Sequence, residues 1–131
     1  MAATILVVED EPAIQELIAY NLKQAGHNLL KADNAEQAMH IVQTALPDLV
    51  LLDWMLPGIS GVEFARRLRA DRRTKQIPII MLTCRNLDHD IAHGLMEGAD
   101  LYITKPFEMD KLMLAVRRLL AVAGDAAGTT D

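Results

Sequence analysis

Hydrophobic residues in this 131-residue chain gather in five short runs separated by longer mixed segments. Three of the runs are apolar throughout and do not alternate with polar residues. This pattern predicts strands buried on both faces, as in a parallel sheet covered by helices. The first and third runs lead directly into carboxylates, at Glu9 and Asp53. We expect strands at residues 4–8, 28–32, 48–52, 77–82 and 101–104.

The mixed segments between the runs have the spacing of helices. Pro12 suits the first turn of a helix and Gly26 its C-terminal cap, while Asn34 is a good N-cap for the next helix. In the first segment the spacing i, i+3, i+4 and i+8 predicts one apolar stripe, formed by Ile14, Leu17, Ile18 and Leu22. We expect helices at residues 12–25, 34–45, 61–70, 87–97 and 108–122.

Each predicted strand leads into a helix, so we expect an α/β domain with (βα)5 organisation. Right-handed crossovers then give an open, doubly wound, five-stranded parallel sheet, with any ligand site at the C-terminal ends of the strands. The length suits a single domain. Small and polar residues at 123–131 predict a flexible tail or the start of a truncated linker, which leaves residues 1–122 as the domain.

Composition argues against several classes of protein. Apolar residues make up 51% of the chain, yet no apolar stretch approaches the roughly 20 residues of a membrane span. The N-terminus lacks the basic segment of a secretory signal, and one cysteine, Cys84, cannot form an internal disulfide and fits a reducing cytoplasm. A net charge of −5 disfavours nucleic-acid binding by this domain, so we expect the basic segment 66–75 to be a solvated helix face.

The ends of the predicted strands carry the candidate chemistry. In a parallel sheet these ends share one edge, so the carboxylates, hydroxyl and ammonium that follow the strands are expected to converge in one shallow cleft. Clustered carboxylates repel one another unless a cation intervenes, and Mg²⁺ typically takes one or two carboxylates, a carbonyl and waters. The converging residues are Glu9, Asp10, Asp53, Thr83 and Lys105.

This set of groups suits phosphoryl transfer. Asp10 and Asp53 are the expected direct Mg²⁺ ligands, with the Met55 carbonyl as a third and Glu9 acting through water. Asp53 is then the expected nucleophile, forming an acyl phosphate without any general base, because a carboxylate is already ionised. Mg²⁺ and the Lys105 ammonium would neutralise the phosphoryl group, and the Thr83 hydroxyl would hydrogen-bond one of its oxygens.

Four motifs carry a family resemblance: "VVEDEP", "LLDWMLPGISG", "MLT" and "YITKPF". Together they resemble bacterial CheY-like response-regulator receiver domains over residues 4–120, most closely the winged-helix OmpR/PhoB class and its phosphate-regulon regulators. The resemblance implies a flavodoxin/CheY-like strand order 2-1-3-4-5, with Asp53 as the phosphoacceptor. It also implies a cis peptide bond before Pro106, and Tyr102 as the switch aromatic that turns inward when Thr83 moves toward the phosphoryl group.

The same resemblance implies a function in two-component signal transduction. A sensor histidine kinase would phosphorylate Asp53 with Mg²⁺, which changes the face formed by residues 87–97, 101–104 and 108–122. An output domain absent from this chain would then regulate transcription. The domain is expected to be cytoplasmic, to contact neither nucleic acid nor membrane itself, and to be no enzyme beyond catalysing its own phosphorylation and dephosphorylation.

The chain departs from its family on the face through which winged-helix receivers usually form dimers. Charged residues that would pair across that face are replaced, and two of the replacements make the surface more apolar. Loss of such charges costs specificity and register. We therefore expect that the chain does not dimerise in the family manner, the alternative being a more hydrophobic contact. The replaced positions are Ile91, Leu101, Lys111 and Ala115.

Three alternatives stay open from the sequence. A Mg²⁺ phosphatase with an aspartate nucleophile generally has an acidic residue two positions later, where this chain has Met55. A receiver-like binding module that never takes up phosphate would not require Thr83 and Lys105 beside the carboxylates. A stand-alone regulator that acts by protein–protein contact is also compatible with the sequence.

Overall fold

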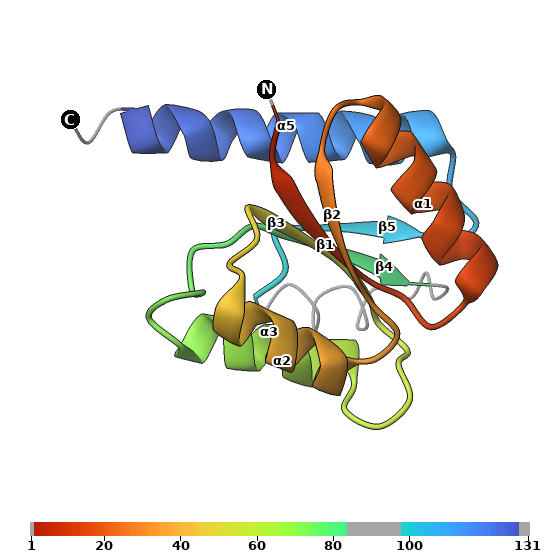
Figure 1. Ribbon diagram of the computed structural model, residues 1–131, viewed down its shortest axis with the longest axis vertical. Coiled ribbons are helices and arrows are strands. Elements are labelled where there is room, and N and C mark those ends of the chain that lie inside the picture. Colours follow the sequence, from red (N-terminus) through yellow and green to blue (C-terminus); the bar gives the residue numbers. More distant parts are fainter. Residues whose placement is uncertain (1, 84–97, 129–131) are drawn as a thin grey trace.

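The computed structural model describes residues 2–83 and 98–128, with side chains described up to residue 123. Five parallel strands form one sheet in the order β2-β1-β3-β4-β5, which confirms the predicted fold (Figure 1). The helix predicted at 87–97 lies outside the described residues. The elements are β1 Thr4–Val8, α1 Pro12–Gln24, β2 Asn28–Ala32, α2 Ala35–Thr44, β3 Leu49–Asp53, α3 Gly61–Ala70, β4 Ile79–Thr83, β5 Leu101–Thr104 and α5 Met109–Gly128.

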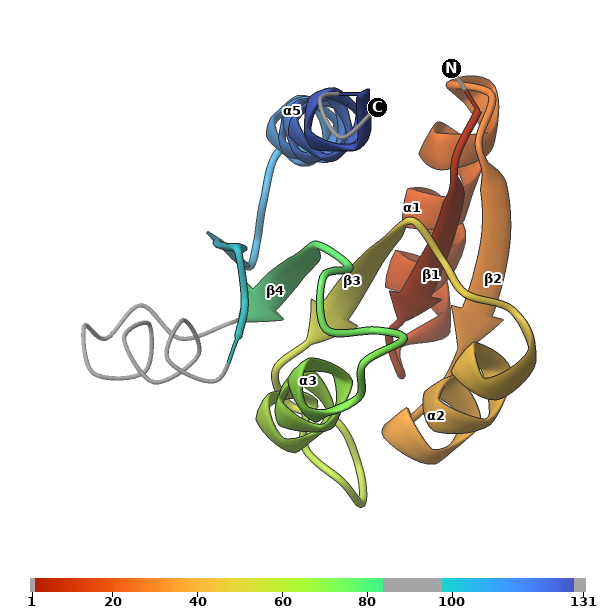
Figure 2. The same ribbon diagram turned by 90° about the vertical axis from the view of Figure 1, so that its left-hand side faces the viewer.

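Helices α1 and α5 cover one face of the sheet, and α2 and α3 cover the other (Figure 2). Successive strand side chains point to opposite faces, so the apolar runs fill two cores at once. In β1, for example, Ile5 and Val7 pack under α1 and α5, while Leu6 and Val8 pack under α2 and α3. The three central strands are therefore buried on both faces, as their uninterrupted apolar character predicts.

Local sequence signals set the helix ends as expected. Pro12 occupies the first turn of α1, where its missing N–H costs nothing. Gly26 has φ +92°, and its N–H donates to the Lys23 carbonyl while the His27 N–H donates to the Leu22 carbonyl. These two bonds form a Schellman cap, which the left-handed conformation of the glycine permits. Helix α2 begins after Asn34, whose side chain accepts the Gln37 N–H.

The buried face of α1 differs from the predicted stripe. Ile18 and Leu22 are buried and Ile14 packs against the same core, as predicted. Leu17, however, is 55% exposed, and Gln15 and Ala19 are buried as well. The most deeply buried residues have the spacing i, i+3, i+4 and i+7 from Gln15, so the buried face extends further to this side of the helix than predicted and includes a polar residue. Three of the four predicted positions and the helix itself are therefore confirmed, and only the assignment of Leu17 to the buried face was wrong.

Some element boundaries also differ. Strand β3 includes Asp53, β4 begins at Ile79 rather than at residue 77, and α5 continues to Gly128 beyond the predicted end at 122. The extension of α5 runs through several alanines, which have the highest helix propensity of any residue. None of the described helices combines the length and the apolar character that crossing a bilayer requires.

Substitution within the core between the sheet and helices α1 and α5 tests this packing. Leu51 is fully buried there, so Leu51→Ala is expected to lower the free energy of unfolding by about 2–5 kcal/mol, because a cavity remains. Leu46 is 49% exposed, and Leu46→Ala should change it by no more than about 0.5 kcal/mol. Urea unfolding of both variants measures the difference, and equal losses would contradict the assigned core.

Candidate functional site at the strand ends

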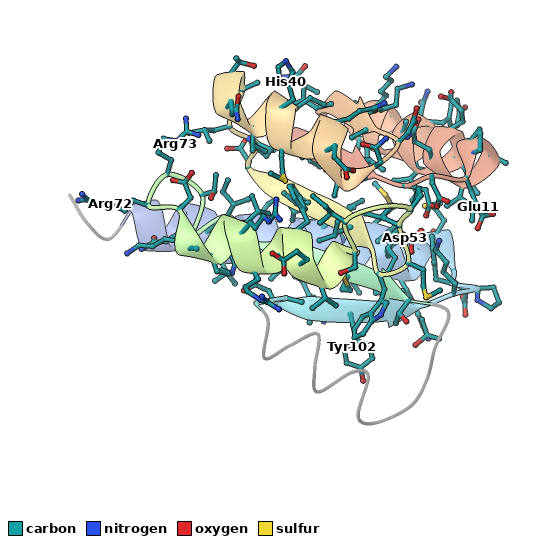
Figure 3. All side chains as sticks on the ribbon, turned by 90° about the horizontal axis from the view of Figure 1, so that it is seen from below. Glu11, His40, Asp53, Arg72, Arg73 and Tyr102 are labelled. Carbon is teal, nitrogen blue, oxygen red and sulfur yellow. The ribbon has the colours of Figure 1, made fainter. Side chains whose placement is uncertain are left out.

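Four candidate residues stand at the ends of four different strands, along one edge of the sheet. Glu9 follows β1, Asp53 ends β3, Thr83 ends β4 and Lys105 follows β5. Glu9, Asp53 and Thr83 are 0%, 5% and 1% exposed, so the first two are carboxylates held almost out of contact with water. In Figure 3, Asp53 lies at the same edge as Glu11. The sequence prediction that these residues converge is consistent with their placement.

Glu9 is held by contacts on both of its carboxylate oxygens. Its Oε1 lies 2.7 Å from the Lys105 ammonium, and its Oε2 accepts the Glu11 N–H at 3.1 Å. Its own N–H donates to the Ala32 carbonyl at the end of β2. A fully buried carboxylate is tolerated only when it is paired and hydrogen-bonded in this way.

The Asp53 carboxyl group holds its proton to a higher pH than an ordinary aspartate does. Its Oδ1 accepts the Met55 N–H at 3.1 Å, and its Oδ2 lies 3.4 Å from the Lys105 ammonium. Burial and the negative charge of Glu9 nevertheless outweigh these contacts and raise the pKa of Asp53 from 3.8 to about 7. Among the residues that the structure describes, the site therefore contains more negative charge than the Lys105 ammonium balances.

Lys105 connects the two carboxylates to β4. Burial alone would lower the pKa of its ammonium, but the hydrogen bond to Glu9 and the charges of Asp53 and Glu9 together raise it. The Lys105 N–H also donates to the Thr83 carbonyl at 2.6 Å. The peptide bond between Lys105 and Pro106 is cis, as the family resemblance implies.

Gly61, the last residue of the motif "LLDWMLPGISG", explains one part of its spacing. A Cβ on Gly61 would collide with the backbone carbonyl of Asp53, and the Gly61 N–H donates to the Trp54 carbonyl at 3.1 Å. Helix α3 can therefore begin directly against the end of β3 only because this residue has no side chain. Ser60 caps the same helix by accepting the Glu63 N–H.

The acidic residues are close enough together to bind one cation. Glu9, Asp10 and Asp53 each offer a carboxylate oxygen, and these oxygens lie within 4.8 Å of one another. Asp10 is exposed, and with Met55 it lines a shallow hollow of about 450 Å³ beside the buried pair. One accessible carboxylate beside two buried ones fits a small, oxygen-preferring cation such as Mg²⁺ that keeps some of its water.

The other predicted residues lie away from this cluster. Tyr102, on the edge strand β5, is 39% exposed, and in Figure 3 its side chain points away from Asp53. Leu101 is 38% exposed on the same edge strand, and Lys111 is exposed on α5, where Ala115 is half-buried. Ile91, like Cys84, lies outside the described residues.

Sequence reasoning missed Gln15. Its side-chain amide donates to the Glu9 carbonyl at 3.0 Å, which places it directly behind the acidic cluster. The available signal was its spacing with Ile18, Ala19 and Leu22, which puts a polar residue on a buried helix face.

Comparison with known proteins identifies the family to which this site belongs. The chain matches the response regulator receiver domain over residues 5–117, nearly its whole folded length. It belongs to the response regulator receiver family. The α/β fold, the acidic strand ends and the lysine followed by a cis proline are thus found in a receiver domain of two-component signal transduction.

Curated relatives of this receiver domain are transcriptional regulators. The phosphate regulon transcriptional regulatory protein PhoB of Pseudomonas aeruginosa is 49% identical over 121 residues, covering 92% of this chain and 53% of that protein. PhoB of Rhizobium meliloti is 46% identical over 123 residues, with the same coverage of both chains. The receiver domain thus spans about half the length of the curated relatives it matches.

Solved structures agree with the fold. NtrX from Brucella abortus has a TM-score of 0.90 at 30% identity, covering 99% of this chain and 30% of that chain. The receiver domain of a sensor histidine kinase from Pseudomonas aeruginosa has a TM-score of 0.84 at 30% identity, covering 92% and 99%. That neighbour was solved with a magnesium ion coordinated in its active site cleft.

The raised pKa of Asp53 predicts a pH-dependent stability in the absence of metal. Between about pH 4 and 7 the folded receiver holds a proton on Asp53 that the unfolded chain has lost, so the contribution of Asp53 to stability decreases as the pH rises. Asp53→Asn should therefore gain stability relative to wild type over this range, and the displacement from 3.8 to about 7 sets an upper bound of about 4 kcal/mol.

Urea unfolding of both proteins in EDTA, near pH 5 and near pH 8, measures this effect. The advantage of Asp53→Asn should be larger near pH 8. A difference in unfolding free energy that is the same at both pH values would show that Asp53 has an ordinary pKa in the folded receiver.

Proposed function

We propose that Asp53 of this receiver domain accepts a phosphoryl group from a sensor histidine kinase in a Mg²⁺-dependent reaction. The observation that carries this proposal is the buried Asp53 carboxylate beside the Lys105 ammonium. Two further carboxylates, of Glu9 and Asp10, lie close enough to Asp53 to bind one metal ion together with it. Membership of the receiver family supports it. The roles assigned to individual residues follow from their chemistry and their placement.

Magnesium binding fits the groups present. Asp10, Asp53 and the Met55 carbonyl would hold the ion, and Glu9 would act through water. Bound Mg²⁺ supplies positive charge that offsets the excess of carboxylates and the charge of the phosphoryl oxygens. The magnesium ion in the cleft of the related kinase receiver supports this assignment.

The residues of the chain divide the transfer between them. An Asp53 oxygen attacks the phosphorus in line with the leaving group, so a new O–P bond forms as the P–N bond of the donor phosphohistidine breaks. The bonding electrons leave with the imidazole. The Lys105 ammonium stabilises charge on the phosphoryl oxygens, and the Thr83 hydroxyl donates a hydrogen bond to one of them. The transfer needs no general base, because the attacking carboxylate is already ionised.

The response to phosphorylation is proposed to pass through β4 and β5. Thr83 ends β4 and Tyr102 lies on the exposed edge strand β5, so movement of either alters the surface formed by β5 and α5. Since the named relatives are transcriptional regulators about twice as long as this chain, we propose that the altered surface controls a transcriptional output domain.

Intact mass spectrometry after incubation with acetyl phosphate tests the proposal. Wild type is expected to gain the mass of one phosphoryl group only when Mg²⁺ is present, and Asp53→Asn should gain none. Asp10→Asn should need much more Mg²⁺, because an accessible ligand is removed.

Asp48→Asn is the matched control at the other end of β3. The Asp48 side chain accepts the Thr4 N–H, and an asparagine oxygen can accept it as well. The Asp48→Asn variant should therefore be phosphorylated on Asp53 like wild type. If acetyl phosphate and a phosphorylated histidine kinase both leave wild type unmodified, the proposal is wrong, and the acidic cleft belongs to a binding module.

We also propose that the receiver does not form the charge-paired dimer of its class. Leu101 on β5 and Lys111 on α5 stand where acidic residues are expected, so the usual opposite charges cannot meet across this face. Sedimentation at micromolar concentration should show a monomer before and after phosphorylation. A tight dimer seen only after phosphorylation, and weakened by Leu101→Arg, would overturn this proposal.

A further inference from the structure

Gln15 is a buried polar residue on the face of α1 that packs against the sheet. It is 7% exposed, and its neighbours on that face, Ile18, Ala19 and Leu22, are apolar. An uncompensated amide in this position would cost about 1–3 kcal/mol, so its hydrogen bonds determine whether it is tolerated.

The amide nitrogen of Gln15 has acceptors from two separate loops. Its Nε2 lies 3.0 Å from the Glu9 carbonyl, 3.1 Å from the Ala32 carbonyl and 3.1 Å from Asp33 Oδ1. Two amide hydrogens serve these three acceptors, so the donor capacity of the group is fully used. Gln15 therefore ties the loop after β1 to the loop after β2.

The second of these loops is itself fixed. The Asp33 N–H donates to Gln37 Oε1 at 2.9 Å, and the Gln37 N–H donates to Asn34 Oδ1 at 2.8 Å. The start of α2 thus holds Asp33 in place. Gln15 consequently joins the loop that carries Glu9 and Asp10 to a rigid helix terminus.

We propose that Gln15 is a positioning residue for the divalent cation, acting through the main chain of Glu9. The Glu9 carbonyl belongs to the planar peptide unit that also contains the Asp10 N–H, so fixing its direction fixes where the Asp10 backbone begins. Gln15 touches neither the cation nor the phosphoryl group. This inference rests on the Mg²⁺ site proposed above and adds a residue that determines its affinity.

Gln15→Met tests the role, because methionine has a similar length but no donor. Mg²⁺ is titrated while the fluorescence of Trp54, the single tryptophan and the neighbour of Asp53, is followed. The half-saturating concentration should rise on the order of 10-fold, as for other residues that orient metal ligands. Phosphorylation by acetyl phosphate at saturating Mg²⁺ should stay close to the wild-type rate, since the reacting groups are unchanged.

Thr74→Val is the matched control for lost stability. Thr74 is 1% exposed and donates to the Leu68 carbonyl at 2.6 Å in the loop before β4, away from the acidic cluster. It should lower the free energy of unfolding without changing the Mg²⁺ midpoint. An unchanged midpoint in a folded Gln15→Met, with wild type binding normally, would overturn the inference alone. Absence of Mg²⁺ binding by wild type would instead overturn the proposed function.

A measurement on wild type covers the case in which Gln15→Met does not fold. The side-chain amide resonances of Gln15 should shift during a Mg²⁺ titration with the same midpoint as the Trp54 fluorescence, because the two loops adjust together. The side-chain amide resonances of Gln43, which is exposed near the C-terminal end of α2, should not shift. Gln15 resonances that stay fixed while Trp54 responds would contradict the proposed coupling.

Discussion

The pairing of two buried carboxylates with one ammonium is the interaction on which the site depends. Glu9 and Asp53 are almost completely removed from water, and the Lys105 ammonium lies within 3.4 Å of both. One positive charge cannot balance two negative ones at low dielectric, so the arrangement favours whatever supplies more positive charge. A proton on Asp53 is one solution, which is why its pKa rises to about 7. A divalent cation is the other, and it leaves Asp53 ionised and therefore nucleophilic.

Parallel strand order makes this concentration of charge possible. Asp53 and Lys105 lie far apart in the sequence, yet Asp53 ends and Lys105 follows strands that run in the same direction through an apolar core. The three central strands bury apolar side chains on both faces, and this burial offsets the free-energy cost of burying charged groups at the strand ends. Gly61 then permits the start of α3 to lie directly against the main chain at the end of β3. The core thus supplies a rigid frame, and the reactive groups occupy only its rim.

Sequence patterns predicted the frame better than its details. Uninterrupted apolar runs identify central strands because both faces of such strands are buried, and the acidic residues that follow them locate the candidate site. Helical spacing gives a period but does not fix the edges of the buried face, so Leu17 was assigned to that face and Gln15 was not. The hydrogen bonds of Gln15 could not be predicted, because its acceptors belong to loops whose approach depends on the packed fold. The shorter distance from the Lys105 ammonium to Glu9 than to Asp53 could not be predicted either, because it too depends on how the packed strands place these side chains.

The unequal contacts of Lys105 suggest how charge added at β3 would reach β4. Its ammonium lies 2.7 Å from Glu9 Oε1 but 3.4 Å from Asp53 Oδ2, so the closer partner is the carboxylate that is not proposed to react. A phosphoryl group on Asp53 would increase the negative charge there and attract the ammonium away from Glu9. The Lys105 main-chain N–H donates to the Thr83 carbonyl at 2.6 Å, so a movement of the ammonium that also shifted the Lys105 main chain would shift the end of β4. The main chain of Lys105 would therefore provide a second route to Thr83, besides the proposed hydrogen bond from the Thr83 hydroxyl to the phosphoryl group.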